Sequence, residues 1–80
     1  MKRTILITGG TGFLGRSLGL ALKDENDVVL TGRNNKQNMN ASQLTGCRVL
    51  PMDVANIEAV RDAFTEVKPD VVIHACSTWK

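Results

Sequence analysis

The stretch that decides the fold is "ILITGGTGFLGRSLGLAL", residues 5–22. It passes from a short β-branched and aliphatic run into a glycine-rich segment, residues 9–15, and then into apolar residues at helical spacing. An apolar run bounded by glycine predicts a strand over residues 3–8, and the later periodicity predicts a helix over residues 13–23. Closely spaced glycines between a strand and a helix are typical of a phosphate-binding loop.

The predicted helix shows an apolar stripe interrupted by a glycine. We expect this stripe to face a sheet; it consists of Leu14, Leu18, Ala21 and Leu22. Gly19 lies inside the helix, where glycine costs about 1 kcal/mol relative to alanine. We therefore expect Gly19 to serve close packing of the helix on the sheet.

The rest of the chain repeats the alternation of strand and helix. Apolar runs predict strands over residues 27–31, 47–52 and 70–75. The polar, asparagine-rich segment 33–46 is compatible with a short helix that ends near Gly46. Asn56 can cap a further helix, which ends before Pro69. Its apolar stripe is Ile57, Val60, Phe64 and Val67.

This alternation predicts an α/β protein with a doubly wound parallel sheet. Right-handed crossovers give the strand order 3-2-1-4. The last strand is continuously apolar at Val71, Val72 and Ile73, so we expect an open edge there that a further strand would cover. We therefore expect residues 1–80 to form the first half of a larger dinucleotide-binding domain, either truncated or completed by another chain. His74, the only histidine, is expected to be buried in this strand with its hydrogen bonds satisfied.

Composition excludes several classes of function. The 80 residues carry 10 Lys and Arg against 8 Asp and Glu, a net charge of +2 that is too small to indicate nucleic-acid binding or a membrane surface. No apolar run approaches the roughly 20 residues of a membrane span or the roughly 7 residues of a secretion signal. Cys47 and Cys76 show neither metal-binding nor disulfide spacing, so we expect buried thiols in a cytoplasmic protein without a metal site.

The glycines fit two overlapping spacings. Gly10, Gly12 and Gly15 match GxGxxG, and Gly9 in place of Gly10 gives GxxGxxG. The first glycine forms the turn, the middle one lets a pyrophosphate approach, and the last allows close packing. The alternative is a glycine-rich turn without a ligand, and a P-loop is excluded because no Gly-Lys-Ser/Thr follows. The residues expected to contact a dinucleotide are Gly9, Gly10, Thr11, Gly12, Phe13, Leu14 and Gly15.

The end of the second strand indicates which dinucleotide binds. An NAD site expects an acidic residue about 20 residues after the glycines, whereas an arginine accommodates the 2′-phosphate of NADP. Here Arg33 and Asn34 follow the strand and no carboxylate does. We therefore predict NADP as cofactor, with NAD as the alternative if Arg33 is a solvated arginine or stacks on adenine. Lys36 is a weaker second ligand for the phosphate.

Asp53 follows the third strand and lies at the expected ligand edge of the sheet. Its carboxylate can accept a hydrogen bond from the adenine amine while Val54 packs on the ring. The alternative role is to assist Asn56 at the start of the next helix.

With these residues in place, the chain resembles the extended branch of the short-chain dehydrogenase/reductase superfamily. "TGGTGFLG" (residues 8–15) looks like its cofactor signature, and "MDVANIEAVRDAFTEVKPDVVIHAC" (residues 52–76) is similar to its third strand, next helix and fourth strand. The resemblance implies a Rossmann domain that binds a dinucleotide. It also implies that the residues just past the fourth strand run beside the cofactor: Ala75, Cys76 and Ser77.

The resemblance further implies hydride-transfer chemistry on a nucleotide sugar or a similar alcohol or ketone, in an oxidoreductase, epimerase or dehydratase. The catalytic Tyr-x-x-x-Lys of that family has no counterpart, because the chain contains no tyrosine; we assign no catalytic residue. A non-catalytic dinucleotide-binding module, such as a redox sensor or assembly subunit, is the alternative. By analogy, the full-length protein is expected to form a homodimer.

Overall fold

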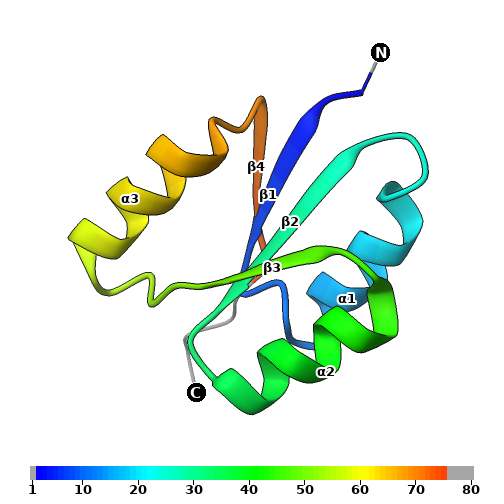
Figure 1. The fold of residues 1–80 in the computed structure, drawn as a ribbon, viewed down its shortest axis with the longest axis horizontal. Coiled ribbons are helices and arrows are strands. Elements are labelled where there is room, and N and C mark those ends of the chain that lie inside the picture. Colours follow the sequence, from blue (N-terminus) through cyan, green and yellow to red (C-terminus); the bar gives the residue numbers. More distant parts are fainter. Residues whose placement is uncertain (1, 76–80) are drawn as a thin grey trace.

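The computed structural model describes residues 2–75 of the chain and contains a four-stranded sheet with three helices (Figure 1). Strands and helices alternate, and each predicted element is present with strand ends within one residue of expectation. In chain order they are β1 (Thr4–Thr8), α1 (Phe13–Leu22), β2 (Asp27–Gly32), α2 (Asn35–Thr45), β3 (Arg48–Pro51), α3 (Ile57–Val67) and β4 (Val71–His74).

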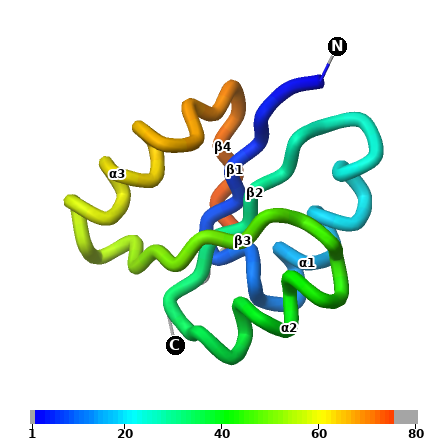
Figure 2. Tube along the Cα trace, in the orientation of Figure 1, coloured from blue at the N-terminus to red at the C-terminus, as the bar shows by residue number. Residues whose placement is uncertain are grey.

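The sheet has the order β3-β2-β1-β4, and all neighbouring strands are parallel. The predicted order 3-2-1-4 is therefore confirmed. β1 and β4 are far apart in sequence but lie side by side (Figure 2), with Thr8 paired to His74. On the other side Gly32 pairs with Pro51. The carboxyl ends of all four strands thus meet at one edge of the sheet.

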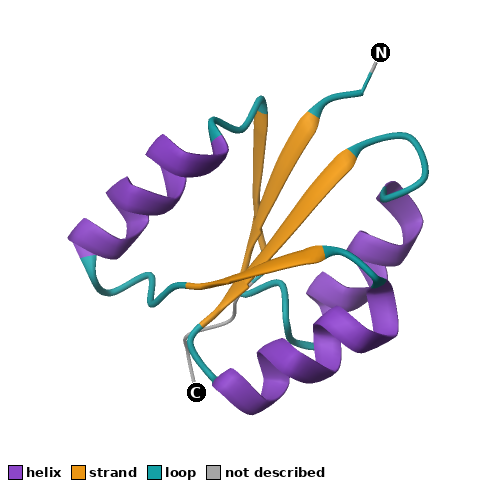
Figure 3. Ribbon diagram, in the orientation of Figure 1, coloured by secondary structure: helices purple, strands orange, loops and turns teal. Residues whose placement is uncertain are grey.

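Helices cover both faces of the sheet: α1 and α2 lie on one face and α3 on the other (Figure 3). Alternate residues of the strands form the core beneath α1 and α2. Its buried members are Ile5, Ile7, Val28, Leu30, Ala41 and Cys47. The expectation that Cys47 is a buried thiol is therefore confirmed, whereas Cys76 lies outside the described residues.

The face that α1 turns to the sheet differs from the predicted stripe. Gly15 and Gly19 are buried, and Leu18 and Leu22 pack against the core. Leu14 and Ala21, which were expected in the stripe, are exposed. The error arises because two of the four inward-facing positions of α1 are glycines, which hydrophobic periodicity does not count.

Gly19 brings α1 close to the sheet, as predicted. A Cβ atom at this position would lie 3.3 Å from Leu30 Cδ2 and 3.4 Å from Cys47 Sγ. These distances are tighter than ordinary van der Waals contact, so even a methyl group would press on the core.

The polar segment after β2 forms an 11-residue helix, α2. Its start is fixed by Asn34, whose side-chain oxygen accepts a hydrogen bond from the Gln37 backbone N–H at 3.0 Å. Its end is fixed by Gly46, which has a φ of 72° and donates its backbone N–H to Ser42 O at 2.9 Å. Capping at both ends therefore defines a helix with little apolar periodicity.

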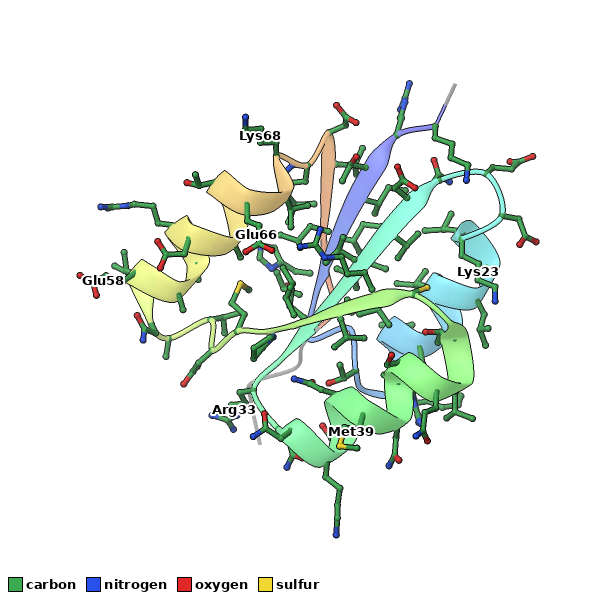
Figure 4. The ribbon with its side chains drawn as sticks, viewed as in Figure 1. Lys23, Arg33, Met39, Glu58, Glu66 and Lys68 are labelled. Atoms are coloured by element: carbon green, nitrogen blue, oxygen red, sulfur yellow. The ribbon has the colours of Figure 1, made fainter. Side chains whose placement is uncertain are left out.

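α3 contacts the sheet through a narrower stripe than predicted. Val60 and Val67 are half-buried and Ala63 is buried, but Ile57 is 71% exposed and Phe64 38% exposed. Glu66 points from α3 toward the sheet (Figure 4) and forms an ion pair with Arg48 of β3. Both side chains are more than half exposed, so this pair contributes only about 0–1 kcal/mol.

The prediction that His74 is buried is wrong. Its side chain is exposed, and within residues 2–75 the strand β4 has a sheet neighbour, β1, on one side only. The expected hydrogen bond is present: His74 Nδ1 lies 2.6 Å from Thr8 Oγ1 on the adjacent strand. The apolar residues of β4 are half-buried, and that a further strand covers this edge stays a prediction. Within residues 2–75, no helix combines the length and apolarity needed to cross a membrane.

Candidate functional site

The candidate site lies where the carboxyl ends of the parallel strands meet. β1 is the point at which the strand order reverses, since β2 and β4 lie on opposite sides of it. Ligands of open α/β sheets bind in the crevice at such a point. Two segments of the chain build this edge: the glycine loop, residues 9–15 after β1, and the Arg33 segment, residues 32–38 after β2.

The first two glycines shape the turn that leaves β1. Gly9 has a φ of 65°, a conformation that favours glycine, so it makes the turn. Gly10 donates its N–H to Thr31 O at 2.8 Å, which ties the glycine loop to β2. A Cβ atom on Gly10 would lie only 2.8 Å from Ile7 O, so the chain passes too close to β1 for a side chain.

Gly15 lets the first turn of α1 press against the same loop. A Cβ atom on Gly15 would overlap the backbone of Gly10. The prediction placed this close packing between the helix and the strand. The structure places this packing instead between α1 and the turn that follows β1.

Gly12 is the exception, because no packing contact demands a glycine there. Its φ is −81°, an ordinary value, and the nearest heavy atom to an added Cβ would be Gly9 O at 3.7 Å. The space above Gly12 is therefore open to a ligand. Gly12 is also the N-cap of α1, and no side chain caps it. An anion that approaches here meets the backbone N–H groups of Phe13 and Leu14, so the loop fits a pyrophosphate.

Arg16 belongs beside this loop, and sequence reasoning missed it. Its Nε donates to Gly12 O at 3.3 Å, which brings a guanidinium to the start of α1. The signal was available: Arg16 is the fourth residue of the helix, and side chains in a helix lean toward its N-terminus. A positive charge there adds to the electrostatic attraction for phosphate.

Arg33 is exposed directly after β2, beside the N-terminal end of α2 (Figure 4). The sequence around it reads GRNNK, so no carboxylate lies within two residues of Arg33 in the chain. A planar guanidinium can form paired hydrogen bonds with phosphate oxygens. Lys36 is also exposed in this segment.

Asn34 already has a structural role at this edge. Its side-chain oxygen caps α2 by accepting from Gln37, so that atom is occupied within the protein. A contact between Asn34 and a cofactor remains a prediction.

Asp53 has the structural role that was considered as the alternative to adenine binding. Its Oδ1 accepts from the Ala55 N–H at 2.9 Å, and its backbone oxygen accepts from the Asn56 N–H at 2.9 Å. These bonds shape the turn into α3. Val54 beside it is exposed, as an adenine contact requires. The adenine contact itself stays a prediction.

Ala75 continues from β4 at the same edge, where its N–H donates to Thr8 O at 2.9 Å. The other two residues expected past β4, Cys76 and Ser77, lie outside the described residues. A cavity of about 490 Å³ lies at the opposite edge and is lined by Thr4 and Asp27, the first residues of β1 and β2. Within residues 2–75, no group of three His, Cys, Asp or Glu side chains is placed to hold a metal.

Comparison with known proteins identifies relatives that share this arrangement. The model of the NAD dependent epimerase/dehydratase family matches residues 5–80. A short-chain type dehydrogenase/reductase from Mycobacterium ulcerans is 25% identical and superimposes with a TM-score of 0.86, covering 98% of this chain and 34% of that chain.

Two further solved structures are also similar to this chain. A protein described as a short-chain oxidoreductase from Thermus thermophilus is 36% identical, with a TM-score of 0.78 over 89% of this chain and 35% of that one. An oxidoreductase of the short chain dehydrogenase/reductase family from Aeromonas hydrophila is 28% identical, with a TM-score of 0.79 over 90% and 38%. The chain thus spans roughly a third of the length of these relatives.

Proposed function

The chain belongs to the NAD dependent epimerase/dehydratase family, and from this premise we propose that it is the NADP(H)-binding portion of an oxidoreductase, epimerase or dehydratase. The observation that carries the choice of NADP is Arg33. It is exposed at the edge where Gly12 leaves the glycine loop open, and no carboxylate follows β2 next to it in the sequence. The glycine loop binds the pyrophosphate, which NAD and NADP share, and Arg33 binds the 2′-phosphate, which only NADP has.

Different residues of the site bind different parts of the cofactor. The N–H groups of Phe13 and Leu14 donate to the pyrophosphate, and Arg16 adds positive charge beside it. Val54 would contact the adenine ring, and Ala75 would lie beside the cofactor toward the nicotinamide ribose. When bound, the nicotinamide ring exchanges a hydride with the substrate.

The substrate class is a nucleotide sugar or a similar alcohol or ketone. The family description, which names epimerases and dehydratases, supports this class. The short-chain dehydrogenase/reductase relatives support the redox chemistry. We place the protein in the cytoplasm and expect the full-length form to be a homodimer.

Titration of the full-length protein with NADPH and with NADH tests the choice of cofactor. We expect tighter binding of NADPH, and a loss of about ten- to hundredfold in NADPH affinity in Arg33→Ala with NADH affinity unchanged, because only a charge-assisted contact to the 2′-phosphate is removed. Arg61→Ala is the matched control, since Arg61 is an exposed arginine on α3. Equal affinity of the wild type for the two cofactors, or an undiminished preference in Arg33→Ala, would refute the proposal.

A further inference from the structure

Asn38 is a buried polar residue of α2 that holds the end of β2. The residue is only 8% exposed, and its Nδ2 donates to Gly32 O at 2.9 Å. The same oxygen accepts a second hydrogen bond from the Met52 N–H, also at 2.9 Å. Two donors from different elements therefore fix the peptide that joins Gly32 to Arg33.

The backbone on the other side of Arg33 is fixed as well. Asn34 caps α2 through its side chain, and its backbone oxygen accepts from the Asn38 N–H at 2.9 Å. Asn38 thus holds the residue before Arg33 with its side chain and the residue after it with its backbone. A long exposed arginine loses less entropy on binding when the backbone that carries it is already ordered.

The side-chain oxygen of Asn38 makes this arrangement unusual. Among the described residues, Asn38 Oδ1 is buried and has no hydrogen-bond partner. Flipping the amide does not help, because the oxygen would then face the oxygen of Gly32. Oδ1 lies 2.6 Å from the position that a Cβ on Gly32 would occupy, and Thr11 Oγ1 of the glycine loop lies against the same position. Asn38 therefore occupies the junction between the glycine loop and the Arg33 segment.

An unpaired buried acceptor lowers stability, so a side chain kept only for packing would be apolar or fully paired. We propose that Asn38 is a positioning residue for cofactor specificity, which orients the Gly32–Arg33 peptide so that the guanidinium meets the 2′-phosphate. This inference rests on the proposed function and extends it. The proposed function concerns Arg33, which contacts the phosphate, and the inference concerns Asn38, which holds the backbone next to Arg33 in place.

Replacing Asn38 by leucine removes the hydrogen bond to Gly32 while conserving the approximate size of the side chain. We expect the ratio of NADH to NADPH dissociation constants in Asn38→Leu to fall about three- to tenfold, with NADH affinity unchanged. The melting temperature should not fall, because the unpaired oxygen is removed with the hydrogen bond. Asn40→Leu is the matched control, since Asn40 is exposed on the same helix.

Asn38→Ala provides a second variant that lacks the donor, and it decides the question if the leucine variant does not fold; Asn40→Ala is its control. If the wild type shows no preference for NADPH, the proposed function and this inference both fail. If the wild type prefers NADPH and the Asn38 variants keep the full preference, this inference alone fails. An equal loss of affinity for both cofactors also overturns it, because that result indicates a general structural role.

Discussion

The glycine loop and the Arg33 segment lie at the same edge of the sheet but are held in place by different means. The glycine loop is held by its backbone: Gly9 turns, Gly10 bonds to Thr31, and Gly15 contacts Gly10 directly. The Arg33 segment has backbone hydrogen bonds too, but it depends in addition on two side chains, the cap of Asn34 and the amide of Asn38.

This difference corresponds to what each segment recognises. Backbone N–H groups at a helix start bind any pyrophosphate, so the glycine loop suits every dinucleotide. Side chains can be exchanged without altering the strand and helix around them, so the Arg33 segment can distinguish one dinucleotide from another. Variants that damage the two segments should therefore fail in different ways.

The largest effect is expected where the glycine loop packs on itself. In Gly15→Ala the new Cβ would overlap the backbone of Gly10, which cannot move aside as a flexible side chain does. We expect the free energy of unfolding to fall by about 3 kcal/mol, the upper end of the usual cost of overpacking. Chemical denaturation of the full-length variant measures this loss.

Gly19→Ala is the matched control in the same helix. There the new Cβ would meet the side chains of Leu30 and Cys47 at 3.3 and 3.4 Å, and alanine favours the helix by about 1 kcal/mol. These effects oppose each other, so stability should stay within about 1 kcal/mol of wild type. Equal destabilisation of the two variants would show that the contact between Gly15 and Gly10 has no special role.

A smaller and different effect is expected at Gly12. The space around it is open, so Gly12→Ala should fold, with a free energy of unfolding lower by only about 0.5–1 kcal/mol because glycine is a better N-cap residue than alanine. The added methyl group would block the pyrophosphate, and affinity for NADPH and NADH should fall together by about tenfold or more. Isothermal titration with each cofactor measures both losses. A selective loss of NADPH would contradict the assignment of the glycine loop to the shared pyrophosphate.

More of the structure of the glycine loop than of the Arg33 segment could be predicted from the sequence. Local rules predicted the strand, the turn and the helix, because each depends on residues adjacent in the chain. These rules failed where the burial of a residue depends on residues that are distant in the chain and pack against it. Hydrophobic periodicity placed Leu14 and Ala21 in the face of α1 that packs on the sheet, although both are exposed, and an apolar context suggested that the exposed His74 was buried.

Sequence predicted that Arg33 matters but not how it is held. The bond from Asn38 to Gly32 joins residues in different elements, and the unpaired oxygen of Asn38 is evident only once Gly32 and Thr11 are placed around it. The polar composition of residues 33–46 gave no periodic signal for α2, whose ends depend on caps. Residues that position a ligand contact are set by tertiary structure, and a single sequence does not reveal them.

The smallest effect is expected from the cap of the Arg33 segment. Asn34→Ala removes the acceptor for the Gln37 N–H and should lower the free energy of unfolding by about 1 kcal/mol. Asn56→Ala is the matched control, since Asn56 caps α3 in the same way by accepting from the Ala59 N–H at 3.1 Å. Both variants should lose similar stability in thermal or chemical denaturation.

Cofactor titration then separates the two caps. Because Asn34 follows Arg33 directly, only Asn34→Ala should reduce the preference for NADPH, and by less than Arg33→Ala does. An equal change of preference in both variants would mean that specificity follows overall stability rather than the order of this segment. A change confined to Asn34→Ala would show that the side chains fixing the backbone around Arg33 contribute to specificity, while the backbone of the glycine loop provides affinity that both cofactors share.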